Sequence, residues 1–144
     1  MSDFLLVHGS CHGAWAFDRL IPELEALGHT ARAIDLPSHG EDKTPPREVT
    51  LEGYAKAIFA AIDAPTIVVG HSMAGYPLTL AADMAPEKFR RLIYLCAYVP
   101  MAGKSLAEMR RLAPRLQFGD QPVKGPGAVA GAVDQKEIRH GRSV

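Results

Sequence analysis

The chain has 144 residues, 47% of them hydrophobic and 22% charged, a composition typical of one globular domain and not of a disordered or collagen-like protein. Sixteen basic and sixteen acidic side chains give a formal net charge of zero, so no strong overall field favours nucleic acid or an anionic membrane as a partner. Two cysteines, Cys11 and Cys96, are too few for a disulfide framework or a four-thiolate zinc site.

Short apolar runs alternate with helical patterns from the start of the chain. Residues 4–7 (FLLV) and 31–34 predict two strands, and Leu20, Leu24 and Leu27 predict the apolar face of a helix between them that ends at Gly28. Thr50 is a candidate N-cap for a second helix, whose apolar face includes residues 51, 54, 58 and 62.

The alternation continues through the middle of the chain. Residues 66–69 (TIVV) predict a third strand, residues from about 73 to 85 a helix that stops before Pro86, and residues 92–96 a fourth strand. Each crossover between parallel strands must carry the chain back over one face of the sheet, so this order indicates an α/β fold. We predict three layers with a mostly parallel sheet of about four strands.

Beyond this region the pattern weakens. Ser105 and Glu108 form a capping-box pattern that predicts a helix reaching Pro114. Residues 119–144 contain five glycines and no Phe, Trp or Tyr, which is typical of loosely ordered chain. We therefore predict a core at residues 4–113 and a loosely ordered tail at residues 114–144.

Residues 70–75 (GHSMAG), directly after the third predicted strand, carry the most chemical information. A serine two residues after a strand-ending glycine fits a sharp strand-to-helix turn, the nucleophile elbow, which lifts its hydroxyl above the carboxyl edge of the sheet. Ser72 would then lie at a helix N-terminus, where free amides favour developing negative charge. The usual pattern is G-x-S-x-G, whereas here Ala74 takes the last position and Gly75 follows. We expect His71 to pack near the site or support it rather than to act as the base.

Residues 7–10 (VHGS), at the end of the first predicted strand, complete the candidate site. If this strand lies beside the one that carries Ser72, the backbone amides of Ser10 and Met73 can form an oxyanion hole. Three further residues are candidates to line or support the pocket: His8, Gly9 and His12. The imidazoles and thiol of residues 8–12 also allow a metal-site interpretation, but no second ligand cluster accompanies them, and we expect no metal.

Three motifs in this order, VHGSCHGAW (residues 7–15), DLPSHG (35–40) and VGHSMAG (69–75), resemble the α/β-hydrolase superfamily. The nearest resemblance is to the group of plant methyl-ester esterases of the salicylic-acid-binding type and hydroxynitrile lyases, and it covers residues 4 to about 113. It implies that Ser72 is the nucleophile, that Ser10 and Met73 supply the oxyanion amides, and that the helix from Ser105 begins a lid.

Position 9 separates the two branches of that group. In the lyase branch, the residue after the histidine that matches His8 is typically a threonine whose hydroxyl contacts the cyanohydrin. This chain has Gly9 there, which favours the esterase branch. The resemblance thus implies a carboxylic-ester hydrolase that acts on a small-molecule ester without metal or organic cofactor.

The base and the orienting carboxylate of a serine hydrolase are not identified in the sequence. In this fold they follow the serine in the order Asp, His, on loops after later strands. Asp120, Asp134 and His140 are the candidates, but none follows a predicted strand. We therefore expect a sheet that stops before its last two strands, with an exposed edge prone to self-association. A cyanohydrin-type lyase and a catalytically inactive fragment remain as alternative functions.

Other functions fit the sequence poorly. Residues 103–105 (GKS) match the end of the phosphate-binding loop motif, but position 98, where that motif requires its first glycine, is Tyr98. The basic side chains of residues 104–115 fit the solvated face of a helix better than a nucleic-acid surface. No apolar run reaches the roughly 18 residues of a membrane span and no signal-peptide pattern is present, so we expect a cytoplasmic protein.

Overall fold

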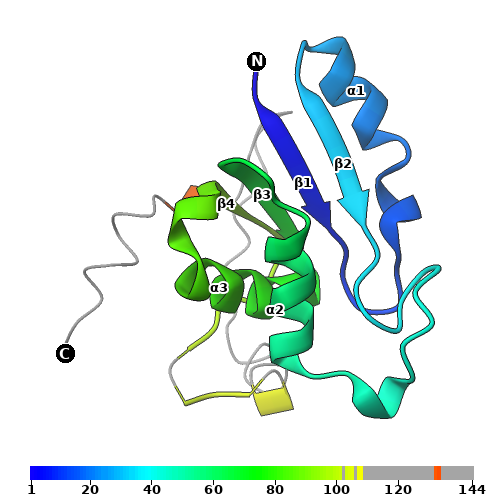
Figure 1. The fold of residues 1–144 in the computed structure, drawn as a ribbon, viewed down its shortest axis with the longest axis vertical. Helices are drawn as coiled ribbons and strands as arrows, with labels where there is room; N and C mark the ends of the chain where they lie inside the picture. The colour runs from blue at the N-terminus through cyan, green and yellow to red at the C-terminus, as the bar shows by residue number, and fades with distance from the viewer. Residues whose placement is uncertain (102, 106, 109–131, 134–144) are drawn as a thin grey trace, which may run out of the picture.

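The computed structural model describes residues 1–101, 103–105, 107–108 and 132–133. Its sheet has the strand order β2-β1-β3-β4-β5, and the first four of these strands are parallel (Figure 1). They are β1 (Asp3–Val7), β2 (Thr30–Ile34), β3 (Thr66–His71) and β4 (Phe89–Leu95). The predicted α/β architecture with about four parallel strands is confirmed.

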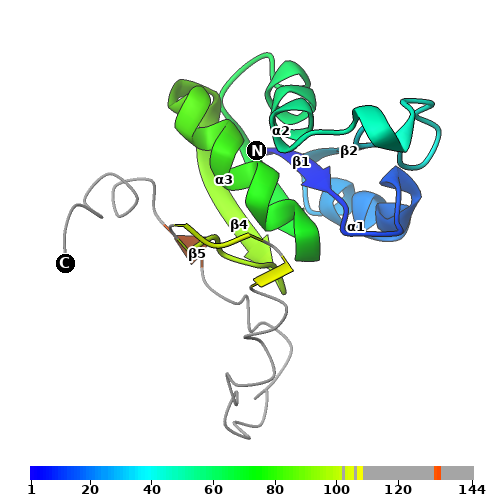
Figure 2. The same cartoon turned by 90° about the horizontal axis from the view of Figure 1, so that it is seen from below.

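Three α-helices connect the strands: α1 (Leu20–Ala26), α2 (Leu51–Ala60) and α3 (Gly75–Met84). Helices α2 and α3 lie side by side on one face of the sheet and α1 lies on the other (Figures 1 and 2). Short 3-10 turns complete the connections: Ala14–Phe17, Pro46–Glu48, Ser72–Ala74 and Pro86–Lys88. The Thr50 hydroxyl accepts a hydrogen bond from the Gly53 N–H at 2.9 Å, so the predicted N-cap of α2 is confirmed.

The alternation of side chains along the strands builds a core on each face of the sheet. Leu5, Val7 and Val68 point to the face of α2 and α3, where they join Ile58 and Leu78 in the larger core. The neighbouring side chains point to the other face, where α1 covers them. That smaller core contains Leu6, Phe17 and Val69, with Ile21 and Leu24 packed against it.

Two predicted details are wrong. Of the leucines assigned to the apolar face of α1, Leu27 is 73% exposed and Leu20 is 37% exposed, while Ile21 packs on the sheet with Leu24. Leu20 is the first residue of this seven-residue helix and Leu27 is the C-cap that follows it, so both lie beyond the residues that reach the sheet. The fourth strand begins at Phe89 rather than residue 92, because two consecutive exposed arginines, Arg90 and Arg91, interrupt the apolar pattern.

The outer edge of β4 is paired at two positions rather than fully open. The short strand β5 (Ala132–Val133) runs antiparallel to β4, opposite Leu92 and Ile93. The remainder of the predicted tail lies outside the described residues. Among the residues that the structure describes, no helix has the length and apolar character needed to cross a membrane.

The predicted capping box after residue 104 forms. The Ser105 N–H and hydroxyl donate to one carboxylate oxygen of Glu108 at 2.8 and 2.7 Å, and the Glu108 N–H donates to the Ser105 hydroxyl at 3.3 Å. The helix expected beyond Glu108 lies outside the described residues.

Candidate active site

Ser72 occupies a sharp turn between β3 and α3, at the carboxyl edge of the sheet. Its φ angle is +53°, in the left-handed region that residues other than glycine rarely adopt. The Ser72 carbonyl accepts a hydrogen bond from the Tyr98 N–H at 3.1 Å, which ties the turn to the segment after β4. The local backbone is therefore the strand-turn-helix expected for residues 70–75.

Two glycines make this turn sterically feasible. A Cβ atom at Gly70 would lie 2.9 Å from the Leu78 side chain, and one at Gly75 would overlap the Tyr98 carbonyl oxygen. The close approach therefore requires glycine at position 75, whereas Ala74 is accommodated as a fully buried residue. This explains how a motif that departs from G-x-S-x-G still forms the turn.

The loop after β1 lies directly against Ser72. Parallel pairing places Val7 opposite Gly70, so both strands end at the same edge. A Cβ atom at Gly9 would lie 2.9 Å from the Ser72 Cβ and 3.0 Å from His71 Nδ1. Gly9 thus allows the backbone of this loop to approach the serine, and the loop that contains Ser10 lies beside Ser72. The roles of Gly9, Ser10 and Met73 in a site, and the direction of the Ser10 and Met73 amides, stay predictions.

His8 is completely buried and has a defined tautomer. The Leu36 N–H donates to His8 Nε2 at 3.1 Å, so Nε2 carries no proton and Nδ1–H donates to the Gly9 carbonyl oxygen at 2.8 Å. Burial lowers the pKa of His8, which favours this neutral form. Because both ring nitrogens have backbone partners, His8 supports the loop and is neither a base nor a metal ligand here.

The other two histidines of the site form an aromatic group beside Ser72. The rings of His12 and His71 meet edge to face with their centroids 5.9 Å apart. The ring centroids of His12 and Trp15 are 5.5 Å apart. His12 Nδ1 is 2.8 Å from the Ser10 carbonyl oxygen. Burial, and to a lesser extent the charge of His12, lowers the pKa of His71. Within the described residues, no group of three His, Cys, Asp or Glu side chains is arranged to hold a metal ion.

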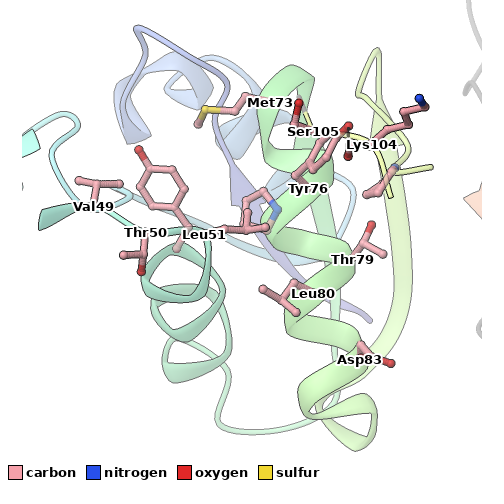
Figure 3. A pocket seen from close by; sticks show the side chains of 13 residues that line it. Val49, Thr50, Leu51, Met73, Tyr76, Thr79, Leu80, Asp83, Lys104 and Ser105 are labelled. Carbon is pink, nitrogen blue, oxygen red and sulfur yellow. Dashed lines mark hydrogen bonds between the residues drawn. The ribbon is translucent and has the colours of Figure 1, made fainter. Parts of the chain in front are cut away.

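A cavity of about 680 Å³ opens between α2, α3 and the segment around Lys104 (Figure 3). Its walls are largely apolar, and a volume of this size is typical of small-molecule sites. Its lining includes Leu51 and Tyr54 from α2, Tyr76 and Leu80 from α3, and Met73 from the turn. Ser72 is not among the lining residues, so the cavity adjoins the serine through Met73 rather than enclosing it. No sequence motif marks this cavity, because its lining residues are separated in the chain.

The candidate triad partners Asp120, Asp134 and His140 all lie outside the described residues.

Comparisons with known proteins agree with this geometry. The model of the "Alpha/beta hydrolase family" matches residues 4–140. Methylesterase 4 of Arabidopsis thaliana is 39% identical over 104 residues, which cover 67% of this chain and 40% of that protein. Esterase PIR7B of Oryza sativa subsp. japonica is 36% identical over 77% of this chain and 46% of its own length. The chain therefore spans less than half the length of these curated relatives.

Solved structures show the same similarity. An extracellular alpha/beta-hydrolase from a Paenibacillus species superposes with a TM-score of 0.69 at 32% identity, covering 74% of this chain and 45% of that one. Polyneuridine aldehyde esterase gives the same TM-score and identity over 80% of this chain and 48% of its own. Together with the strand order and the turn at Ser72, the family match shows that this chain belongs to the alpha/beta hydrolase family.

Proposed function

We propose that this chain carries the nucleophile and the oxyanion hole of a carboxylic-ester hydrolase, with Ser72 as the nucleophile. The observation that carries the proposal is the left-handed Ser72 at the β3–α3 turn, with the backbone of Gly9 packed against its Cβ. A strained turn of this kind exposes a serine hydroxyl at the top of the sheet in this fold. The methylesterases and esterases among the relatives support an ester as the substrate.

In the proposed reaction, the Ser72 oxygen attacks the ester carbonyl carbon while a base removes the hydroxyl proton. The carbonyl oxygen becomes an oxyanion that accepts hydrogen bonds from the Ser10 and Met73 N–H groups, each worth about 3 kcal/mol to the transition state. The intermediate collapses, the alkoxide leaves with the proton, and an acyl-serine remains. Water then attacks the acyl group by the same steps, releasing the carboxylic acid and restoring the serine.

We assign neither the base nor its carboxylate partner to the described residues. His8 uses both ring nitrogens on backbone groups, and His12 Nδ1 lies 2.8 Å from the Ser10 carbonyl oxygen. His71 directly precedes Ser72 on the same turn, and its ring faces His12. In this fold the acid and the histidine come from loops after later strands. We propose that they correspond to the portion of the relatives that this chain does not match.

The cavity beside Met73 is the proposed site for the apolar part of the ester. Met73 contributes its side chain to the cavity wall and, in this mechanism, its amide to the oxyanion hole. A substrate whose carbonyl lies at Ser72 would therefore extend its apolar group along α3, past the side chains of Tyr76 and Leu80. This arrangement supports a substrate with a sizeable apolar acyl or alkyl group.

The test is covalent labelling of the purified chain with a fluorophosphonate probe, read by mass spectrometry. We expect one adduct on Ser72 that forms slowly, because no base is assigned in this chain, and its loss in Ser72→Ala. Ser38→Ala is the matched control, because Ser38 also has a left-handed backbone in a loop at the carboxyl edge, with φ +65°. Labelling that persists in Ser72→Ala, or no labelling of the folded chain, would contradict the proposal that Ser72 is a competent nucleophile.

A further inference from the structure

The loops that leave β1 and β2 are joined to each other by two hydrogen bonds at the carboxyl edge of the sheet. The Ala14 N–H donates to Asp35 Oδ1 at 2.6 Å, and the Leu36 N–H donates to His8 Nε2 at 3.1 Å. Each loop thus contributes one backbone N–H and one side-chain acceptor. Because β1 and β2 are paired in parallel up to Val7 and Ile34, both bonds form immediately beyond the strands.

Asp35 uses both carboxylate oxygens on backbone amides. While Oδ1 accepts the Ala14 N–H, Oδ2 accepts the Glu41 N–H at 2.9 Å. Burial raises the pKa of Asp35, but the hydrogen bonds from Glu41 and Ala14 outweigh it, and the pKa lies below the ordinary value. The side chain is therefore ionised at neutral pH and accepts at both positions.

Two glycines close around the Asp35 carboxylate. A Cβ atom at Gly13 would lie 2.8 Å from Asp35 Oδ1, and one at Gly40 would overlap the carboxylate. Gly13, with φ −142° and ψ −172°, leads directly into the 3-10 turn that begins at Ala14. The carboxylate thus fixes the end of the loop of residues 8–14, whose start is fixed by β1.

His8 fixes the middle of the same loop by holding one peptide plane. Its Nδ1–H donates to the Gly9 carbonyl at 2.8 Å. The Gly9 carbonyl and the Ser10 N–H belong to one planar trans peptide group and point in opposite directions. A hydrogen bond that orients the Gly9 carbonyl therefore also orients the Ser10 N–H.

We propose that Asp35 and His8 act as a pair of positioning residues that hold the Ser10 amide in the direction needed for the oxyanion hole. Asp35 holds the far end of the loop through Ala14, and His8 sets the Gly9–Ser10 peptide plane while its ring is anchored by Leu36. The inference rests on the proposed function, in which Ser10 supplies an oxyanion amide. Neither residue touches the substrate in this scheme.

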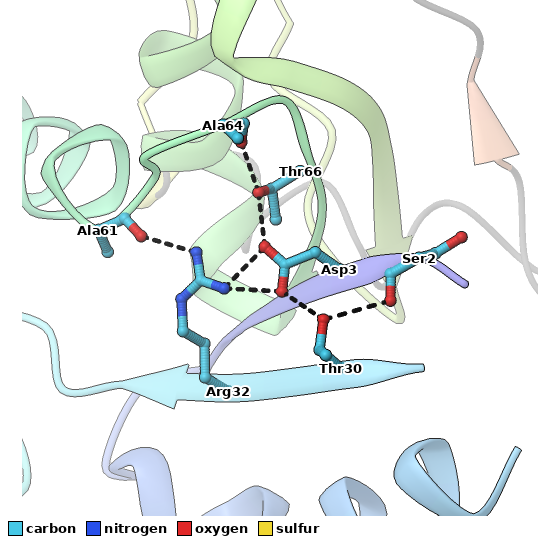
Figure 4. A network of polar contacts seen from close by, with 7 residues as sticks. All are labelled: Ser2, Asp3, Thr30, Arg32, Ala61, Ala64 and Thr66. Atoms are coloured by element: carbon cyan, nitrogen blue, oxygen red, sulfur yellow. Dashed lines mark hydrogen bonds and ion pairs between the residues drawn. The ribbon is translucent and has the colours of Figure 1, made fainter. Parts of the chain in front are cut away.

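Asp35→Asn is the first test variant. It has the shape of aspartate but only one acceptor oxygen, so either the Ala14 or the Glu41 amide would face an NH₂ group. The matched control is Asp3→Asn at the amino edge of the sheet (Figure 4). Asp3 also accepts several hydrogen bonds, including two from Arg32 at 2.8 and 2.7 Å and one from Thr66 at 2.9 Å.

Ala14→Pro is a second variant, in case Asp35→Asn does not fold. Proline removes the N–H that binds Asp35, and it is favoured at the first position of a helical turn after an extended residue such as Gly13. Ala14→Pro therefore removes the donor of the hydrogen bond between Ala14 and Asp35 and keeps the Asp35 carboxylate.

Three measurements are made on each folded variant: stability to urea, amide NMR, and the rate of Ser72 labelling by the fluorophosphonate. The Ser10 amide is followed in every variant, and the Ala14 amide in those that keep alanine at position 14. We expect Asp3→Asn and Asp35→Asn both to lose stability. Only Asp35→Asn and Ala14→Pro should shift the Ser10 amide resonance, and both should slow labelling by about tenfold or more per folded molecule. In Asp35→Asn, faster exchange of the Ala14 amide should accompany the shift.

The inference is overturned if the Ser10 resonance in Asp35→Asn and Ala14→Pro is the same as in Asp3→Asn, or if labelling slows equally in Asp3→Asn. Failure of the proposed function has a different signature, which is no labelling of the unmodified chain. In that case the amide resonances still decide whether Asp35 controls the position of Ser10.

Discussion

Substitution of Gly9 by alanine tests the contact between the β1 loop and Ser72 most directly. The added Cβ would lie 2.9 Å from the Ser72 Cβ, 3.0 Å from His71 Nδ1 and 3.3 Å from the His71 carbonyl oxygen. To reach an ordinary contact of 3.4 Å, the loop and the turn must separate by about 0.5 Å. The Ser72 Cβ cannot swing away as the end of a flexible side chain can, so backbone must move.

Overpacking of this kind typically costs about 1–3 kcal/mol of folding free energy. In a chain of 144 residues, each kcal/mol lowers the melting temperature by about 2–4 °C. We therefore expect Gly9→Ala to melt at least about 2 °C below the unmodified chain in a calorimetric or circular-dichroism scan. A displacement of about 0.5 Å between the serine and its oxyanion donors should also slow fluorophosphonate labelling about tenfold.

Gly53→Ala is the control for the loss of a glycine. Its Cβ would lie 3.2 Å from the Thr50 hydroxyl, but alanine also favours the helix that Gly53 occupies by about 0.5–1 kcal/mol. These effects oppose each other, and we expect stability within about 1 kcal/mol of the unmodified chain with unchanged labelling. A Gly9→Ala chain with unchanged melting temperature and labelling rate would refute the packing of Gly9 against Ser72.

Three further variants test other parts of the structure. Thr50→Ala should lose about 1 kcal/mol in urea unfolding, because the Gly53 N–H loses its cap acceptor. Burial raises the Asp3 pKa, but hydrogen bonds from Arg32 and other donors lower it below its ordinary value, so the carboxylate stabilises the fold above about pH 4. The difference in melting temperature between the unmodified chain and Asp3→Asn should therefore be complete at pH 6 and shrink as the pH falls below about 4. Ser72→Gly should be more stable than Ser72→Ala by up to about 1 kcal/mol, because glycine relieves the left-handed strain, and neither variant should be labelled.

The sequence predicted those features of the fold that depend on local patterns. The β-branched run before Ser72 is a central buried strand. Thr50 and Ser105 are caps because each hydroxyl accepts a hydrogen bond from the backbone N–H three residues later. The predicted apolar face of α1 is wrong. Leu20 and Leu27, at the start of this short helix and just after its end, match the helical period but do not reach the sheet. Periodicity identifies a helix better than it identifies the residues that the helix buries.

The features that the sequence did not reveal depend on residues from separate loops. Asp35 lies between an apolar strand and a turn-rich loop, where an aspartate is usually a simple turn residue. Only the parallel pairing of β1 with β2 brings it to the Ala14 amide. The signal that could have found it was the pair of glycines, Gly13 and Gly40, since each marks a close approach.

The strained backbone conformations of this fold lie at the carboxyl edge of the sheet. Four non-glycine residues in the described chain have a left-handed φ: Cys11, Ser38, Ser72 and Cys96, at 61°, 65°, 53° and 46°. Each lies in the loop that leaves a different parallel strand, β1 to β4, and each such conformation costs about 1–2 kcal/mol. Strain of this size persists only where surrounding contacts hold it, as Tyr98 does at Ser72 and Asp35 does around the β1 loop. The opposite edge instead carries the stabilising Asp3–Arg32 ion pair at 2.7 Å. The edge that bears the candidate site is thus held by specific hydrogen bonds between loops. We expect substitutions of the residues that make these hydrogen bonds to change the reactivity of Ser72 more than the stability of the fold.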